Sequence, residues 1–69
     1  MERQPVSSEL ANSVGYDTAT STLEIEFKSG VVWQYYDVPE YVFHELMGGS
    51  IGRYFHANIK GQYAESRVG

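Results

Sequence analysis

Hydrophobic and polar residues alternate most regularly between Thr22 and Lys28. Every second side chain there is apolar, and the apolar ones are Leu23, Ile25 and Phe27. Side chains of an extended strand point alternately to its two faces, so this spacing predicts a strand with one buried and one solvated face. Val14 and Tyr16 carry a shorter alternation, and a polar stretch follows at 18–21. This pattern predicts a first strand and a turn, both ahead of the strand at 22–28.

The residues after the clearest strand predict a hairpin. Ser29-Gly30 contains a glycine that tolerates a positive φ, and residues 31–36 are rich in β-branched and aromatic side chains. A two-residue turn places Trp33 and Tyr35 on the solvated face, where they form a candidate binding platform. A three-residue turn opposes Trp33 to Phe27 and places both aromatics in the core. The sequence leaves both registers open.

A first helix is predicted to follow. Asp37 can cap its first turn, Glu40 can reach back to the cap, and Pro39 costs little because first-turn amides have no helical partner. Apolar residues then recur at spacings of three and four, and they are Val42, Phe43, Leu46 and Met47. Gly48-Gly49 is expected to end the helix in a left-handed cap.

A second, shorter helix is predicted between Ser50, a candidate N-cap, and Gly61, which can close it. One side of this helix is expected to carry Ile51, Tyr54, Phe55, Asn58 and Ile59. The element order then predicts an α+β fold, in which a three-stranded antiparallel meander carries two short helices on one face. Residues 1–11 and 64–69 show no sustained period and are expected to be loosely ordered parts of one domain, 1–69.

Length and composition agree with one small cytoplasmic domain. The chain has 69 residues and no cysteine, and six Tyr, three Phe and one Trp must supply much of its core. No apolar run approaches the roughly 20 residues that span a bilayer, and the polar start lacks the pattern of a signal peptide. No membrane partner is therefore expected.

Basic residues are concentrated toward the end of the chain. Residues 1–45 hold eight acids and two bases, whereas residues 46–69 hold one acid and three bases. On a regular helix, Arg53, His56 and Lys60 would share one side and form a basic stripe able to contact phosphates. The alternative is an ordinary solvated helix face, and the net charge of −4 counts against nucleic acid.

Aromatic side chains extend this candidate site, because single-stranded nucleic acid is held by cations together with stacking rings. The full candidate set is Arg53, Tyr54, His56, Lys60, Tyr63, Trp33 and Tyr35. A protein-interaction module is the competing hypothesis, with a sheet edge or an aromatic face meeting a partner or a second copy.

Enzyme chemistry has little support in the sequence. The two histidines, His44 and His56, fall on different predicted helices, and no cysteine is available to complete a zinc site. No serine lies in a nucleophile-elbow sequence. We therefore expect no catalytic residue, no metal or cofactor and no small-molecule substrate.

Four segments carry a resemblance to a known family: SVGYD at 13–17, LEIEFKSG at 23–30, WQYYDVP at 33–39 and GRYFHANIKGQY at 52–63. Together they resemble the KTSC domain family, found at the C-terminus of some lysyl-tRNA synthetases and as small stand-alone bacterial proteins. The family's central Tyr-x-Tyr motif falls on Trp33-Gln34-Tyr35, with Trp in place of the first Tyr. The resemblance implies an RNA-binding accessory module.

Overall fold

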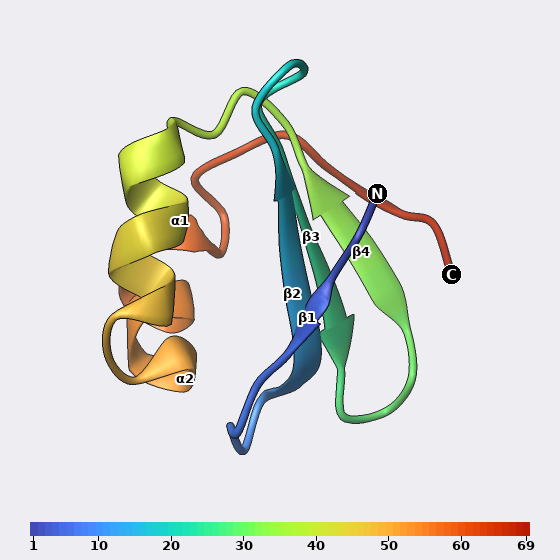
Figure 1. The fold of residues 1–69 in the computed structure, drawn as a ribbon, viewed down its shortest axis with the longest axis vertical. Coiled ribbons are helices and arrows are strands. Elements are labelled where there is room, and N and C mark those ends of the chain that lie inside the picture. The colour runs from blue at the N-terminus through green and yellow to red at the C-terminus, as the bar shows by residue number, and fades with distance from the viewer.

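Five antiparallel strands form one sheet, in the order in which they occur along the chain (Figure 1). The computed structural model describes residues 1–69. The strands are β1 (Gln4–Pro5), β2 (Ala11–Asp17), β3 (Thr22–Phe27), β4 (Val32–Tyr35) and β5 (Glu65–Arg67). The predicted α+β class and antiparallel meander are confirmed, but the predicted number of three strands is wrong.

The two additional strands lie at the edges of the sheet and come from the segments expected to be loosely ordered. β1 has two residues and β5 has three, and all five residues are exposed to solvent. Such short, fully exposed strands show no alternation of buried and solvated residues. They form because β1 pairs with β2 and β5 pairs with β4.

The central hairpin has a register that differs from both expected ones. Its three-residue loop, 28–30, begins one residue earlier than predicted, and Gly30 has a φ of 94°. Trp33 consequently lies opposite Ile25 rather than Phe27. Tyr35, which is only 3% exposed, lies on the same face of the sheet as Trp33. Both aromatics therefore point to the core side, and the solvated platform is ruled out.

Helix α1 (Glu40–Met47) follows β4 and begins without the predicted cap. Pro39 occupies the N-cap position in an extended conformation, and no side chain caps the helix. Asp37 instead has a φ of 56° and turns the chain from the sheet toward the helix. The predicted left-handed cap is also wrong, because Gly48 has a φ of −87°.

Two further helical segments follow, α2 (Ile51–Tyr54) and the π-helix η1 (Phe55–Ile59). The predicted cap is confirmed, because the Ser50 hydroxyl oxygen accepts from the Arg53 amide at 3.3 Å. The Lys60 amide donates to the Phe55 carbonyl, five residues back, so the helix is wider than an α-helix. This widening changes which residues face inward, and Asn58, expected on the apolar side, is exposed.

The core lies between the sheet and the helices, which cover one face of the sheet (Figure 1). Its buried residues are Ala11, Val14, Leu23, Ile25, Tyr35, Val38, Val42, Leu46, Ile51, Phe55 and Ile59. The Phe55 ring packs edge-on against Phe27 and Tyr35, with ring centres 5.5 and 5.7 Å away. Each fully buried aliphatic or aromatic side chain contributes about 1.5 to 3 kcal/mol, so these helices are held mainly by packing. None of them is long and apolar enough to cross a bilayer.

The opposite, outer face of the sheet carries a hydrogen-bonded polar network. Arg3 donates to a Glu24 carboxylate oxygen at 2.5 Å and to the Ser13 hydroxyl at 3.0 Å. Gln34 donates to the other Glu24 oxygen at 2.8 Å, and Tyr36 donates to Gln34 at 3.1 Å. This outer-face network joins the segment around β1 to β2, β3 and the end of β4. It also leaves Glu24 only 8% exposed.

Candidate nucleic-acid interface

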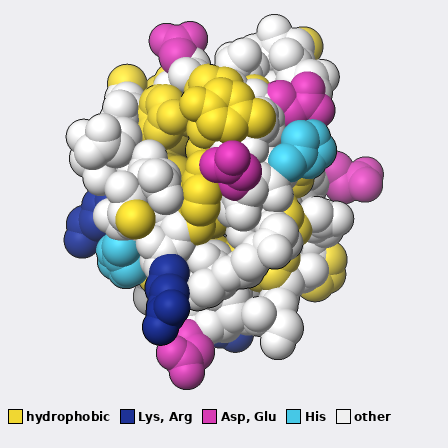
Figure 2. Space-filling model, turned by 90° about the vertical axis from the view of Figure 1, so that its left-hand side faces the viewer, with side chains coloured by type: hydrophobic (Ala, Val, Ile, Leu, Met, Phe, Trp, Pro, Cys, Tyr) yellow, Lys and Arg dark blue, Asp and Glu magenta, His cyan; other side chains and the backbone are white.

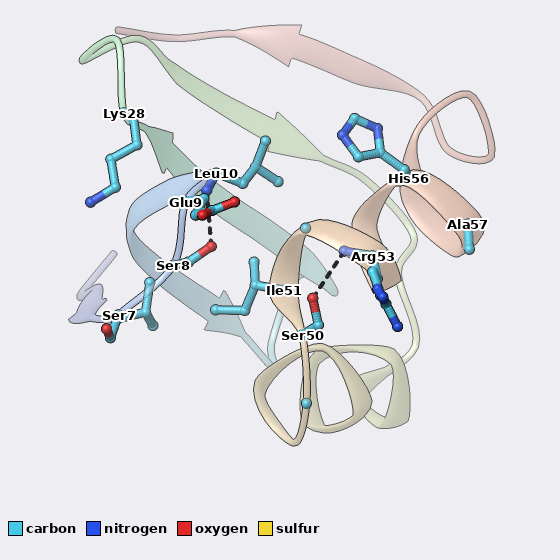
Figure 3. A pocket seen from close by; sticks show the side chains of 13 residues that line it. Ser7, Ser8, Glu9, Leu10, Lys28, Ser50, Ile51, Arg53, His56 and Ala57 are labelled. Atoms are coloured by element: carbon cyan, nitrogen blue, oxygen red, sulfur yellow. Dashed lines mark hydrogen bonds between the residues drawn. The ribbon is translucent and has the colours of Figure 1, made fainter.

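An open groove separates the N-terminal arm, defined as residues 1–10, from the second helical segment (Figure 3). Residues 6–10 of the arm form one wall, and residues 49–53 with His56-Ala57 form the other. Lys28, in the loop between β3 and β4, completes the lining. The volume of about 1380 Å³ is large for a chain of this length, and the groove is wide and open to solvent.

Three cationic or ionisable side chains reach this groove from different elements. Lys28 comes from the hairpin loop, Arg53 from α2 and His56 from η1, and all three are exposed (Figure 3). None of them takes part in an ion pair. Glu9 is the one carboxylate in the lining. The groove is thus a basic region on a protein whose net charge is −4, and it favours an anionic ligand.

A tyrosine cluster (Tyr41, Tyr54 and Tyr63) lies on the helical side of the molecule. The Tyr54 hydroxyl donates to the Glu45 carboxylate at 2.6 Å, and this bond together with burial raises the pKa of Tyr54 to about 12. Burial and the nearby Tyr41 phenol raise the pKa of Tyr63. Tyr41 itself is 62% exposed. Figure 2 shows hydrophobic side chains gathered in the upper part of this face, with Lys and Arg side chains below them.

Arg53 links the groove to the tyrosine cluster. Besides lining the groove, it borders a smaller hollow that Tyr54 and Asn58 also line. The structure therefore brings together three of the residues that the sequence proposed as a site: Arg53 and His56 in the groove, and Tyr54 beside it. Tyr63 belongs to the tyrosine cluster and lines neither hollow.

Lys60 is not among the residues that line the groove. The predicted basic stripe assumed a regular α-helix that extends to Gly61. The π-helical turn instead ends at Ile59, and Lys60 follows it with an extended backbone, at a ψ of 121°. Lys60 therefore lies outside the periodicity that was expected to align it with Arg53 and His56.

Trp33 and Tyr35 are also separate from the groove. Tyr35 is buried, and its burial together with the Glu65 carboxylate raises its pKa to about 12. Trp33 is half-buried against the core, opposite Ile25 on one side and Arg67 on the other. Both rings act in the packing of the sheet.

Two residues of this surface were missed in the sequence. Lys28 ends the alternating stretch that predicts a strand, and only the observed loop carries it to the groove. No local pattern signals that placement. Tyr41 could have been found, because it lies outside the apolar stripe of α1 that Val42 and Leu46 define.

The surface is suited to binding by charge and stacking. Lys28 and Arg53 can contact phosphate oxygens, and the exposed Tyr41 ring offers a flat apolar surface in the first turn of α1. The structure gathers no group of three or more His, Cys, Asp or Glu side chains that could hold a metal ion.

Comparison with known proteins finds close relatives over nearly the whole chain. The KTSC domain family matches residues 7–63. A crystal structure of a KTSC domain protein from Yersinia pestis superposes with a TM-score of 0.95 and 40% identity, covering 99% of this chain and 97% of that one. An uncharacterised protein of Stutzerimonas stutzeri is 38% identical over 64 residues, which are 91% of this chain and 90% of that protein.

A second kind of relative is much longer. A lysine–tRNA ligase of Nostoc is 47% identical over 49 residues, which are 70% of this chain but only 9% of the ligase. The similarity to the ligase therefore concerns one small segment of that enzyme.

Proposed function

This chain belongs to the KTSC domain family, and we propose that it is a small binding domain for single-stranded RNA. One observation carries the proposal: unpaired Lys28, Arg53 and His56 line an open groove that adjoins a tyrosine cluster through Arg53 and Tyr54. Cations that track a backbone, together with rings on which bases stack, are the recurrent features of single-strand recognition.

In this proposal, the role of each residue follows from its place in the groove. Lys28 and Arg53 contact phosphates of the bound strand from separate parts of the groove, and His56 adds a ring nitrogen at the wall that carries Arg53. Because Arg53 borders both hollows, a strand that leaves the groove across it passes next to Tyr54. Exposed bases then stack on Tyr54 and Tyr41. Double-stranded RNA is disfavoured, because its bases are paired and its recognition needs phosphate contacts over a much longer surface.

The relatives support RNA over DNA. A segment similar to this chain occurs in lysine–tRNA ligases, whose name identifies an RNA as their partner. The shared segment is a small part of those enzymes, so the similarity supports a binding role rather than ligase chemistry.

Fluorescence anisotropy with labelled single-stranded RNA, duplex RNA and single-stranded DNA, at low and near-physiological salt, tests the proposal. We expect saturable binding to single-stranded RNA. Arg53→Ala and Lys28→Ala are each expected to weaken it about tenfold, the equivalent of roughly 1.5 kcal/mol for a charged hydrogen bond. Each should also reduce the slope of the logarithm of affinity against the logarithm of salt concentration by about 0.7, because one phosphate contact is lost.

Lys60→Ala is the matched control, because it removes the same charge from an exposed residue outside the groove. Its affinity should stay within about twofold of the parent, as expected for a distant surface charge. Absence of binding at low salt would refute the function. An equal loss for Lys60→Ala and Lys28→Ala would show that the groove is not the binding surface.

A protein partner is the second candidate function, and one observation favours it. Tyr41 is a large aromatic side chain that is 62% exposed, which is typical of contact surfaces. The sheet edges are less suited, because β1 and β5 are short and β5 carries Glu65 and Arg67. Light scattering that shows only monomers up to high concentration would exclude a second copy as the partner.

A further inference from the structure

The N-terminal arm is both a wall of the groove and a contact of the outer sheet face. Its residues 6–10 line the groove (Figure 3). Arg3 joins the outer-face network on the other side of the sheet. Within the arm, only the two residues of β1 pair with the sheet as a strand. A pairing this short specifies its own register weakly, so other contacts must fix where the arm lies.

Arg3 supplies the most specific of these contacts. Its Nη1 lies 2.5 Å from a Glu24 carboxylate oxygen, and its Nε donates to the Ser13 hydroxyl at 3.0 Å. These acceptors belong to different strands, β3 and β2. A guanidinium is planar and holds its donors in a fixed arrangement, so both bonds form together in one position of the arm.

Gly15 of β2 allows the N-terminal arm to lie close enough to the sheet for these bonds to form. A Cβ atom added at Gly15 would lie 2.4 Å from the Glu2 carbonyl oxygen and 3.2 Å from the Arg3 Cα. Real Cβ atoms do not approach so closely, so any side chain at this position would push the arm away from β2. Because Gly15 lies in an ordinary strand, this close approach is the reason that a glycine is needed there.

Backbone contacts of residues 6–10 connect the position of the arm to the groove. After β1, the Val6 amide donates to the Asn12 carbonyl at 3.1 Å. The Leu10 carbonyl then accepts from the Lys28 amide at 3.0 Å, which ties the end of the arm to the loop that carries the Lys28 side chain. Leu10 also packs next to Gly52 of α2, on the opposite wall. A shift at Arg3 therefore changes both the arm wall and the support of a groove cation.

We propose that Arg3 is a positioning residue for the groove, although it lies on the far face of the sheet. It fixes the register of the N-terminal arm and thereby the spacing of the groove walls and of Lys28. Its effect on RNA affinity rests on the proposed function, whereas its effect on the arm does not.

Two variants displace the arm by different means. Arg3→Gln removes both guanidinium contacts, and Gly15→Ala inserts a Cβ against the arm while leaving every charge in place. Arg67→Gln is the matched control, because it removes an exposed arginine whose Nε donates only to the nearby Gly69 carbonyl. Arg3→Lys retains the charge, and we expect it to displace the arm less than Arg3→Gln does.

Amide hydrogen exchange followed by NMR reads the arm directly. Exchange at the Val6 and Lys28 amides should accelerate about tenfold in Arg3→Gln and Gly15→Ala, because a displaced arm weakens the hydrogen bonds of these amides by about 1.4 kcal/mol. Amides in the middle of β3 serve as the internal reference for global unfolding and should change less. Unchanged exchange at Val6 and Lys28 in both variants would overturn the proposal.

RNA affinity measured on the same variants separates the two proposals. Both arm variants should bind single-stranded RNA several-fold more weakly with the parent salt dependence, because Lys28 and Arg53 remain, and Arg67→Gln should match the parent. Faster exchange with unchanged affinity would overturn the positioning role and leave the RNA function standing. A parent protein that binds no RNA would refute the proposed function, and the exchange data would still decide whether Arg3 fixes the arm.

Discussion

The outer face of the sheet and the groove carry similar side chains in opposite states. On the outer face, Arg3 and Glu24 are paired and largely shielded from water. In the groove, Lys28 and Arg53 are exposed and make no ion pair. The first arrangement uses charge to hold the chain in one register, and the second leaves charge available to a ligand. Pairing and burial, rather than residue type, therefore separate structural from functional charge here.

The strongest test of this contrast is Glu24→Ala. The substitution removes the hydrogen bonds that Arg3 and Gln34 donate to this partly buried carboxylate. The free energy of unfolding should therefore fall by about 3 kcal/mol, at about 1.5 kcal/mol for each bond to a charged group. Urea unfolding followed by circular dichroism measures the loss. Glu9→Ala in the groove lining is the control and should cost less than about 0.5 kcal/mol. Equal losses would mean that the outer-face pair is not a structural contact.

Alkaline unfolding contrasts a core tyrosine with one on the surface. Burial, with the Glu65 carboxylate, raises the pKa of Tyr35 in the folded state to about 12, above its ordinary value of 10.0. The folded state therefore holds this proton more tightly. The stability that it provides is complete below pH 10 and is lost as the pH rises through 12. By pH 12 the loss amounts to about 2 kcal/mol, since one unit corresponds to roughly 1.4 kcal/mol.

Tyr35→Phe should remove most of this decline between pH 10 and 12, as measured by urea unfolding at each pH. Tyr54→Phe should remove a smaller part, although the pKa of Tyr54 is also raised to about 12, because solvent screens the exposed bond to Glu45 from which that shift mainly comes. If both variants flattened the decline equally, the assignment of Tyr35 to the core and Tyr54 to the ligand surface would be contradicted.

The smallest expected effect concerns Tyr54 as a stacking residue. Tyr54→Ala should weaken binding of single-stranded RNA by about 1 kcal/mol, or roughly fivefold, because one base loses its ring partner. Tyr54→Phe retains the ring and should bind within about twofold of the parent, since only a surface hydrogen bond is lost. Anisotropy at one fixed salt concentration measures both. A loss for Tyr54→Phe equal to that for Tyr54→Ala would assign the contact to the hydroxyl group.

The sequence predicted those parts of the fold in which buried side chains recur at a regular spacing along the chain. The alternation at Leu23 and Ile25 gave the correct faces of β3, and the spacing of Val42 and Leu46 gave α1. The edge strands could not be predicted this way, because β1 and β5 bury no side chain and exist only through their partners. The hairpin register depended on where its loop begins, and one residue changed every pairing.

The candidate site was predictable only where it follows one helix. Arg53 and His56 were found because they lie close together in the sequence. The predicted alignment of Lys60 with Arg53 and His56 assumed an α-helical repeat, which the π-helical turn interrupts before Lys60. Lys28 and the arm come from distant segments that tertiary packing alone brings to the groove, so no local periodicity could identify them.

The order of strands in the sheet also bears on how the chain folds. All four pairings join strands that follow one another along the chain, and three of them close only short loops. The pairing of β4 with β5 joins Tyr35 to Glu65 and must enclose both helical segments. Closing a longer loop costs more entropy and slows folding, so the central hairpins are expected to form early and β5 to dock last. By the same reasoning, β5 is the strand whose detachment would precede global unfolding.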